Sequence, residues 1–353
     1  MLRFVHESLP GRVIFGEDSL ARLPEEVERL GVKRALVVST PGHRALAEDA
    51  ARRLGGLAVG VCARAVMHVP VEIAEAAREE ARRLRADAMV AIGGGSTVGL
   101  AKAIALELDL PIIAVPTTYA GSEMTPILGL TEGGAKRTLR DPKVLPKTVI
   151  YDPKLTLSLP PALAGPSGLN AIAHCVEALY ARNADPITSI MAEEGIRALG
   201  EALPRVVEAP GDLEARALAL YGAWLAGAAL AAGGMGLHHK LCHTLGGSFD
   251  LPHAETHAIV LPHAAAYNRD AAPEAMARIA RVLHAKDVPG ALFDLLRRVS
   301  PKTGLAEIGM RHEDLDRAAE LATLAPYDNP RPVTREGVRR LLDDAYHGRR
   351  PEG

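Results

Sequence analysis

The stretch Asp87–Leu106, DAMVAIGGGSTVGLAKAIAL, joins an apolar run to three consecutive glycines and then to a run of small and apolar residues. The first run predicts a buried β-strand, and the last has the composition of a helix. Glycines at 93–95 remove side chains, so the backbone can approach a phosphate where the helix begins. We expect Ser96 and Thr97 to cap this helix. A tight turn without a ligand is the alternative, because the glycines do not follow GxGxxG spacing.

The segments around this stretch predict the fold class. Further buried strands are predicted at 34–40, 57–63, 111–118 and 147–153, and amphipathic helical stretches separate the earlier ones. Strands that alternate with helices indicate a parallel sheet covered on both faces. After Leu159, Pro160 and Pro161 punctuate the chain, and the later segments are helical in period. We therefore predict an α/β dinucleotide-binding domain at 1–158 and an all-helical domain at 159–353.

The composition excludes several functional classes. With 353 residues, 48% of them hydrophobic, and a formal net charge of -2, the chain is long enough for two domains and gives no electrostatic support for a nucleic-acid partner. Three cysteines, Cys62, Cys175 and Cys242, have no paired spacing, so we expect no disulfide framework and a cytoplasmic protein. The N-terminal residues contain no apolar signal core.

One apolar segment, 217–237 (ALALYGAWLAGAALAAGGMGL), has no charged residue and nearly the length of a membrane span. It is rich in alanine and glycine, which favour close helix packing. It therefore predicts a buried core helix and no association with a membrane.

Histidines and one asparagine recur at helical spacing in the C-terminal half. The four-residue spacing of NAIAH (170–174), and that between His239 and His243, places each pair on one helix face. Three imidazoles with one carboxylate would make a zinc or iron site, but Asn170 brings no negative charge. A metal site, a site that has lost its metal and a set of structural histidines all remain open at this point. The candidate catalytic residues are Asn170, His174, His239, His243 and His253, whereas His257 and His263 are expected to be structural.

Several motifs together resemble those of the iron-containing alcohol dehydrogenase superfamily. They are GGGS with Lys102, PTTYAGSE (116–123), NAIAH, HHKLCHTLG and LPHAETHAIVLPH. The stretch from PTTYAGSE through GGAKRTLRDPKVLP is similar to the maleylacetate reductases within that superfamily. The resemblance implies the dehydroquinate synthase-like fold, with a Rossmann-like α/β domain followed by an all-α domain. It also implies a homodimer that uses NADH or NADPH to reduce the dicarboxylate maleylacetate to 3-oxoadipate, in bacterial degradation of aromatic compounds.

The resemblance also implies roles for single residues. The pyrophosphate loop corresponds to Gly94, Gly95 and Ser96, the second nucleotide loop to Thr117, Thr118 and Ser122, and a cofactor-side lysine to Lys136. The family's metal-binding histidines correspond to His174, His239 and His253, and a further active-site histidine to His243. Lys240 and Arg137 are weaker candidates for binding the substrate carboxylates.

Departures from the family pattern change the expected chemistry. Asn170 stands where the alcohol dehydrogenases carry an aspartate, and Gly99 stands at the last position of their GGGSxxD motif. These departures predict that the enzyme holds no metal and that histidines assist hydride transfer. No acidic residue lies near Thr40, where one usually holds the ribose hydroxyls, so the choice between NADH and NADPH stays open.

Three other functions compete with this one. A metal-dependent alcohol or polyol dehydrogenase of the same superfamily is the nearest alternative, and metal analysis with an alcohol-oxidation screen would distinguish it. A lyase of the dehydroquinate synthase type would show no steady consumption of NADH. A non-catalytic nucleotide-binding protein would leave the histidines without a purpose.

Overall fold

The computed structural model describes residues 4, 6, 9, 11–132 and 135–352. The chain divides into two compact units, Leu9–Leu159 and Pro160–Gly353, and the described residue His6 groups with the second unit. His6 Nδ1 lies 3.2 Å from Asp185 Oδ2 in that unit.

A six-stranded sheet forms the centre of the first unit, in the order β1-β8-β5-β4-β2-β3, with all neighbouring strands parallel. The strands are β1 (Arg12–Phe15), β2 (Ala35–Val38), β3 (Ala58–Cys62), β4 (Ala88–Gly93), β5 (Ile112–Pro116) and β8 (Thr148–Tyr151). Five of them fall within the predicted strands, which confirms the parallel α/β architecture. The sixth, β1, was not predicted, because four half-exposed residues give no periodic signal.

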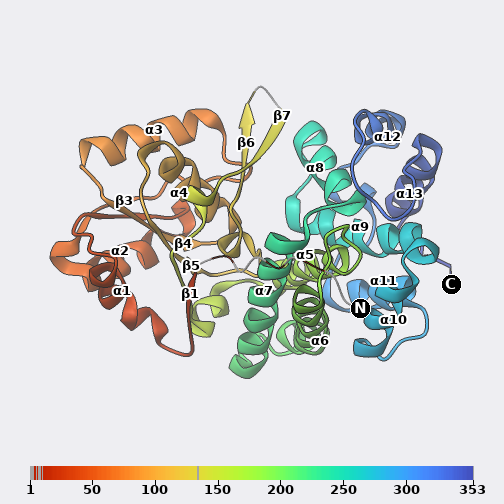
Figure 1. The fold of residues 1–353 in the computed structure, drawn as a ribbon, viewed down its shortest axis with the longest axis horizontal. Coiled ribbons are helices and arrows are strands. Elements are labelled where there is room, and N and C mark those ends of the chain that lie inside the picture. The colour runs from red at the N-terminus through yellow and green to blue at the C-terminus, as the bar shows by residue number, and fades with distance from the viewer. Residues whose placement is uncertain (1–3, 5, 7–8, 10, 133–134, 353) are drawn as a thin grey trace. The chain divides into compact units, whose positions relative to one another are not determined.

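Helices cover both faces of this sheet (Figure 1). They are α1 (Leu23–Arg29), α2 (Arg44–Leu54), α3 (Val71–Arg83) and α4 (Gly95–Leu108). The face that carries Val37, Val90 and Ile113 packs against α1 and α2 and forms a continuous apolar core. On the opposite face α4 packs on β4, and α3 packs on α4. The helices explain why the inner strands β2, β4, β5 and β8 are buried along their whole length: both of their faces are covered.

The strand order creates one reversal of direction in the sheet. From β2 the chain moves to one side to form β3 and then returns to the other side for β4. Ligands of such sheets bind at this reversal, outside the carboxyl ends of the strands. The glycine-rich turn follows β4, so the topology brings it to this position. A separate antiparallel hairpin, β6 (Ile127–Glu132) with β7 (Ala135–Arg140), was not predicted.

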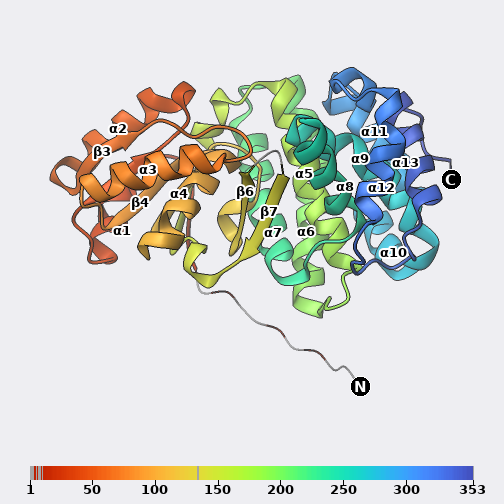
Figure 2. The ribbon, with the colours of Figure 1, turned by 90° about the horizontal axis from the view of Figure 1, so that it is seen from above.

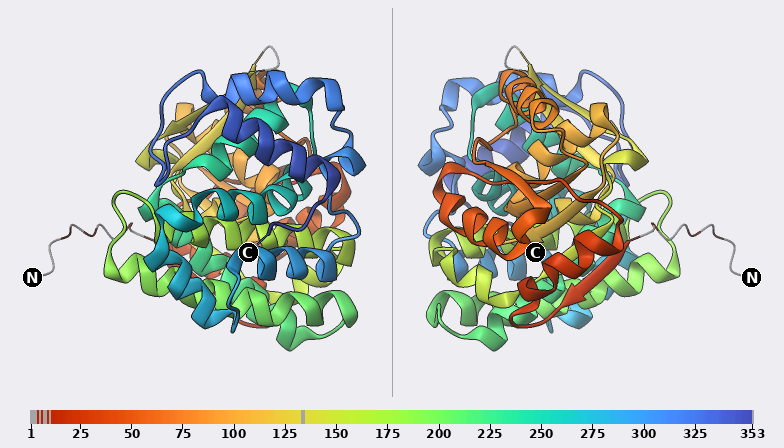
Figure 3. Two further views of the ribbon diagram at one scale, coloured as in Figure 1. Left: turned by 90° about the vertical axis from the view of Figure 1, so that its right-hand side faces the viewer. Right: turned by 90° about the vertical axis from the view of Figure 1, so that its left-hand side faces the viewer.

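The second unit is built from helices, and its described residues form no strand. The helices are α5 (Pro161–Leu179), α6 (Pro186–Glu208), α7 (Leu213–Gly233), α8 (Leu237–Phe249), α9 (His253–Asn268), α10 (Pro273–Val282), α11 (Val288–Val299), α12 (Leu315–Thr323) and α13 (Arg335–His347). Helix α5 packs against α6, α7, α9 and α11, and α8 packs against α9 (Figure 2). The helices of each unit can be followed from two further sides in Figure 3.

Helix α7 contains most of the charge-free segment and is long and apolar enough to cross a membrane by length and composition. Two thirds of its most apolar window, 67%, is buried, and the helix packs against α5 and α6. The small residues therefore serve close helix packing inside this unit.

Candidate active site

The glycine-rich turn leaves the start of α4 open. Strand β4 ends at Gly93, whose φ of +150° suits glycine, and Gly94 is the N-cap residue of a helix that starts at Gly95. No side chain caps this helix, so the prediction that Ser96 and Thr97 cap it was wrong. Both residues lie inside the first turn. The first backbone N–H groups of a helix have no partner within it, and they attract phosphate.

The second predicted nucleotide loop lies directly beside this turn. The Thr117 backbone N–H donates to the Gly93 carbonyl at 3.1 Å, and Thr117 Oγ1 is buried without a hydrogen-bond partner. A Cβ atom on Gly94 would lie 2.9 Å from Thr118 Cγ2, so only glycine fits between the two loops. Backbone donors, an unpartnered hydroxyl and a close approach that only glycine allows together fit a bound pyrophosphate.

The remaining predicted cofactor residues fall in three settings. Thr40 follows β2, and its Oγ1 lies 3.1 Å from His43 Nδ1. Ser122 begins a short 3-10 helix, Ser122–Met124, after β5. The side chains of Lys136 and Arg137 lie outside the described part of the structure, although the Lys136 backbone pairs with Thr131 in the hairpin.

Lys102 is hydrogen-bonded to the second nucleotide loop. The motif resemblance included this lysine, but these contacts were not predicted. Its buried Nζ donates to the carbonyl oxygens of Ser122 at 2.7 Å, Thr125 at 2.7 Å and Ile127 at 2.8 Å. Burial lowers the pKa of Lys102 to about 7. Three short contacts to carbonyls nevertheless need three N–H donors, which only the charged ammonium provides. We conclude that this cage keeps Lys102 protonated and fixes the loop.

Gly99 shows why the aspartate of GGGSxxD is missing. A Cβ atom at this position would lie 2.8 Å from Val69 Cγ2. An aspartate would therefore clash unless Val69 moved, and Gly99 lies in the buried part of α4.

Three helices of the second unit bring the predicted catalytic residues together. Helix α5 carries Asn170 and His174, α8 carries His239 and His243, and α9 begins at His253. The His174 and His239 rings stack with centroids 5.1 Å apart, and the His239 and His243 rings lie 6.0 Å apart. The ring centroids of His253 and His257 lie 4.3 Å apart, and those of His257 and His239 lie 5.2 Å apart. The five predicted residues therefore come from segments that gather at one place in this unit.

Glu177 contacts this histidine cluster and was not among the predicted site residues. Its buried carboxylate lies 2.6 Å from His239 Nδ1 and accepts the backbone N–H groups of Gly236 at 2.8 Å and His238 at 2.7 Å. Burial raises the pKa of Glu177, but His239 and these donors outweigh burial and lower it below 4.5, so the group is ionised at neutral pH. The carboxylate orients the His239 ring and also stabilises the start of α8. Glu177 follows His174 by three residues on one helix face, which is the signal that could have found it.

His174 and Asn170 are buried and present unpartnered atoms. His174 Nδ1 and Asn170 Oδ1 have no hydrogen-bond partner, and neither does His239 Nε2. Burial, followed by the nearby histidines, lowers the pKa of His174 well below 6.5. A neutral His174 beside His239 means that the stacked pair carries at most one positive charge at neutral pH.

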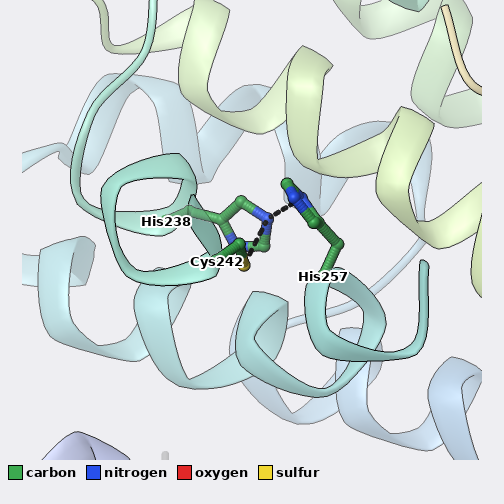
Figure 4. A group of neighbouring side chains, drawn as sticks. All are labelled: His238, Cys242 and His257. Atoms are coloured by element: carbon green, nitrogen blue, oxygen red, sulfur yellow. Dashed lines mark hydrogen bonds between the residues drawn. The ribbon is translucent and has the colours of Figure 1, made fainter. Parts of the chain in front are cut away.

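His257 belongs to the cluster, although it was expected to be merely structural. Its Nδ1 lies 3.0 Å from His238 Nε2, and Cys242 Sγ lies 3.7 Å from the same nitrogen (Figure 4). His263, in contrast, packs edge-on against Phe293 with ring centroids 6.2 Å apart.

Comparison with known proteins identifies the family. The sequence profile described as iron-containing alcohol dehydrogenase matches residues 10–153, and the profile of the C-terminal part of the Fe-containing alcohol dehydrogenase family matches residues 165–346. The chain belongs to the iron-containing alcohol dehydrogenase family. This membership confirms the resemblance seen in the motifs and the expected fold.

Within the family, the chain is similar over its whole length to maleylacetate reductases. It is 57% identical over 351 residues to the maleylacetate reductase of Burkholderia cepacia, covering 99% of this chain and 100% of the relative. The crystal structure of maleylacetate reductase from Agrobacterium tumefaciens superimposes with a TM-score of 0.95 at 54% identity, covering 99% and 100% of the two chains. The chain is therefore an oxidoreductase of this branch of the family.

A more distant neighbour has a nucleotide bound. The sulfoacetaldehyde reductase of Bifidobacterium kashiwanohense, solved in complex with NAD+, superimposes with a TM-score of 0.89 at 24% identity, covering 98% and 99% of the two chains. Identity this low shows the shared fold alone, and the fit of a pyrophosphate to this chain depends on its own glycine turn.

The residues at the position implied for the family's metal lack a negatively charged ligand. The donors there are three imidazoles and the neutral amide of Asn170, and the nearby carboxylate of Glu177 is engaged by His239 and two backbone N–H groups. In the described part of the chain, three His, Cys, Asp or Glu donors come within 4.8 Å of one another at His238, Cys242 and His257 and not at His174, His239 and His253. A divalent ion among neutral ligands would leave its charge uncompensated in a buried site.

Proposed function

We propose that this oxidoreductase reduces the conjugated carbon–carbon double bond of maleylacetate to give 3-oxoadipate, with NADH or NADPH and without a metal ion. The observation that carries the proposal is the histidine cluster itself. It combines a carboxylate-paired imidazole, His239, with a neutral amide, Asn170, where the family's chemistry would need a negatively charged ligand.

The reaction requires one hydride and one proton. Maleylacetate has a ketone conjugated to the double bond, with a carboxylate at each end. When NADH or NADPH is bound, it supplies the hydride that adds to the alkene carbon distant from the ketone. The ketone oxygen then carries negative charge as an enolate, and a proton must reach the neighbouring carbon.

The histidines can stabilise the oxygen anion and deliver the proton. His239 is the best candidate, because Glu177 contacts its Nδ1 at 2.6 Å and leaves Nε2 as the unpartnered nitrogen. With both protons on the ring, His239 would donate from Nε2 to the oxygen while Glu177 balances the charge. A single such donor is commonly worth about 3 kcal/mol in the transition state. His174 is neutral and can add an N–H donor without a second positive charge.

The cofactor is proposed to bind at the carboxyl edge of the sheet in the first unit. The N–H groups at the start of α4 and the unpartnered Thr117 hydroxyl would hold its pyrophosphate. No acidic side chain stands near Thr40 to repel a 2′-phosphate, so we propose both NADH and NADPH as cofactors.

The decisive experiment measures oxidation of NADH and of NADPH with maleylacetate, after purification with and without a chelator. We expect equal turnover in both preparations. Turnover that disappears with chelator and returns with Fe²⁺ or Zn²⁺ would contradict the proposal and favour the metal-dependent alcohol or polyol dehydrogenase. The unpartnered nitrogens of His174 and His239 are the observation on which that second function would rest.

The Asn170→Asp variant tests the donor set directly. It supplies the negative charge that the buried cluster lacks, so we expect a higher affinity for Fe²⁺ or Zn²⁺, measured as metal retained after gel filtration. An unchanged metal content would mean that Asn170 does not face the position of the family's ion.

A further inference from the structure

A second group of donors lies beside the proposed catalytic histidines and has no role in the proposed reaction. His238 and Cys242 lie four residues apart on one face of α8, and His257 faces them from α9 (Figure 4). One ligand atom of each lies within 4.8 Å of the other two, and all three side chains are buried. One thiol and two imidazoles are the ligand types that zinc prefers.

The distances already approach those of a tetrahedral site. With zinc–nitrogen and zinc–sulfur bonds of ordinary length, two nitrogens in a tetrahedron lie about 3.3 Å apart, and a nitrogen and a sulfur about 3.6 Å apart. The observed separations are 3.0 Å between His238 Nε2 and His257 Nδ1 and 3.7 Å between His238 Nε2 and Cys242 Sγ. Small side-chain movements would therefore accommodate a cation.

The charges around these donors also suit a divalent ion. A thiolate at Cys242 contributes one negative charge directly to the ion. The Glu177 carboxylate, which accepts the His238 backbone N–H at 2.7 Å, adds a favourable negative field beside the site while it remains paired with His239. The family's metal position has Glu177 nearby but no thiolate.

We propose that His238, Cys242 and His257 form a binding site for a thiophilic divalent cation such as Zn²⁺ or Cd²⁺, separate from the position at which the family's metal would lie. On binding, the hydrogen bond between the two imidazoles breaks, and the ring that donated it changes tautomer by exchange with solvent. Each ring then carries its one proton on the nitrogen that faces away from the ion. The Cys242 proton leaves to solvent as the metal–sulfur bond forms. Soft sulfur excludes Mg²⁺ and Ca²⁺ from this site.

The site changes how metal content must be interpreted in this protein. A preparation that contains stoichiometric zinc would hold it at Cys242 and still turn over without a catalytic metal. The inference does not depend on the proposed function, because binding is measured without substrate.

The test is a titration of the full chain, stripped with chelator, with Cd²⁺ and with Zn²⁺. We expect one Cd²⁺ per chain and the ultraviolet absorption of a cadmium–thiolate bond. Cys242→Ser should abolish that absorption, and His257→Gln should weaken binding by at least about tenfold. The matched control is Cys175→Ser, since Cys175 is a free, buried thiol on α5, and it should behave as wild type.

Four results would overturn the proposal: no cadmium–thiolate absorption in the wild-type chain, absorption that survives Cys242→Ser, absorption that is lost in Cys175→Ser, or absorption that is lost in His174→Asn or His253→Asn. The variants His174→Asn and His253→Asn locate the ion independently. They should leave the absorption unchanged, and its loss in either of them would place the ion at the family's position. Circular dichroism of each variant verifies folding, and His257→Gln, which keeps the thiol, remains informative if Cys242→Ser does not fold.

Discussion

Glu177 serves both the chemistry and the fold at the scale of one residue. Its carboxylate contacts the His239 ring and two backbone N–H groups at the start of α8. In Glu177→Gln the negative charge disappears while most of the shape remains. We expect kcat for maleylacetate to fall by about a hundredfold, with a smaller change in KM, because the charged His239 loses its partner in the transition state.

The control for Glu177→Gln is Glu208→Gln, which removes an exposed carboxylate paired with Arg298. It should leave kcat unchanged. Equal loss of kcat in both variants, or a loss that simply follows unfolding in circular dichroism, would show that Glu177 acts only through stability.

Replacing Lys102 should lower both the stability of the fold and the affinity for NADH. Lys102→Met leaves three carbonyl oxygens without their donor, and each unmet buried group costs about 1–3 kcal/mol. We expect a loss of several kcal/mol of unfolding free energy in urea and weaker binding of NADH. Lys143→Met, at an exposed lysine near Asp109, should change neither quantity; a mild effect at Lys102 would mean that water replaces the ammonium.

These residues mark the limit of what the sequence predicts at this scale. Asn170, His174, His239 and His243 could be selected because imidazole and amide side chains at four-residue spacing are unusual. His253 was added because the motif resemblance includes it. The contacts of Glu177 and Lys102 were not predicted, because the burial and the partners of a single charged residue in a helix become known only from the fold. The position of Glu177 one helical turn after His174 was the available signal.

The turn between β4 and α4 is the element on which cofactor binding depends. In Gly94→Ala the new methyl group would lie 2.9 Å from Thr118 Cγ2 and push the two loops apart. We expect KM for NADH to rise roughly tenfold, the equivalent of about 1.4 kcal/mol. Gly56→Ala adds the same methyl group where nothing lies within 4 Å, and its KM should match wild type.

The start of α6 gives a prediction about pH. Asp185 accepts the N–H groups of Ile187 at 2.8 Å and Thr188 at 3.1 Å and the hydroxyl of Thr188. Burial raises the pKa of Asp185, but the hydrogen bonds outweigh burial and lower it from 3.8 to about 2. A depressed carboxyl pKa stabilises the fold above pH 3.8, and this contribution is lost as the pH falls through 2.

Asp185→Ala should therefore destabilise the protein by about 2 kcal/mol at neutral pH. The difference from wild type should shrink below pH 3.8, measured by urea denaturation wherever both proteins still fold. Asp270→Ala, at an exposed side chain, is the control. A difference that is independent of pH would show that the charge of Asp185 contributes nothing.

Elements with a strong periodic pattern were predictable, and elements without one were not. Strands β2, β3, β4, β5 and β8 have continuous apolar runs. Such runs are typical of a parallel sheet that helices cover on both faces. The pair β6 and β7 has mixed composition and depends on its own cross-strand pairing. The predicted helix cap was wrong for a different reason. The helix begins at Gly95, so the N-cap residue is Gly94, which has no side chain, and Ser96 and Thr97 lie inside the helix.

At the scale of the whole molecule, family resemblance leads us to expect a homodimer. Light scattering of the purified chain should then give a mass near twice the 37.3 kDa of one chain. A mass of one chain across the concentration range would contradict that expectation.

The oxygen atoms of Glu177 bind the first turn of α8 and one imidazole on that same turn. Helix nucleation and chemical competence are thus tied to a single side chain. A variant designed to change the partner of the His239 ring by replacing Glu177 therefore needs another acceptor for the backbone N–H groups of Gly236 and His238. A chain that folds this helix incorrectly also loses the orientation of the His239 ring. In the proposed reaction, partly folded molecules would therefore have no activity.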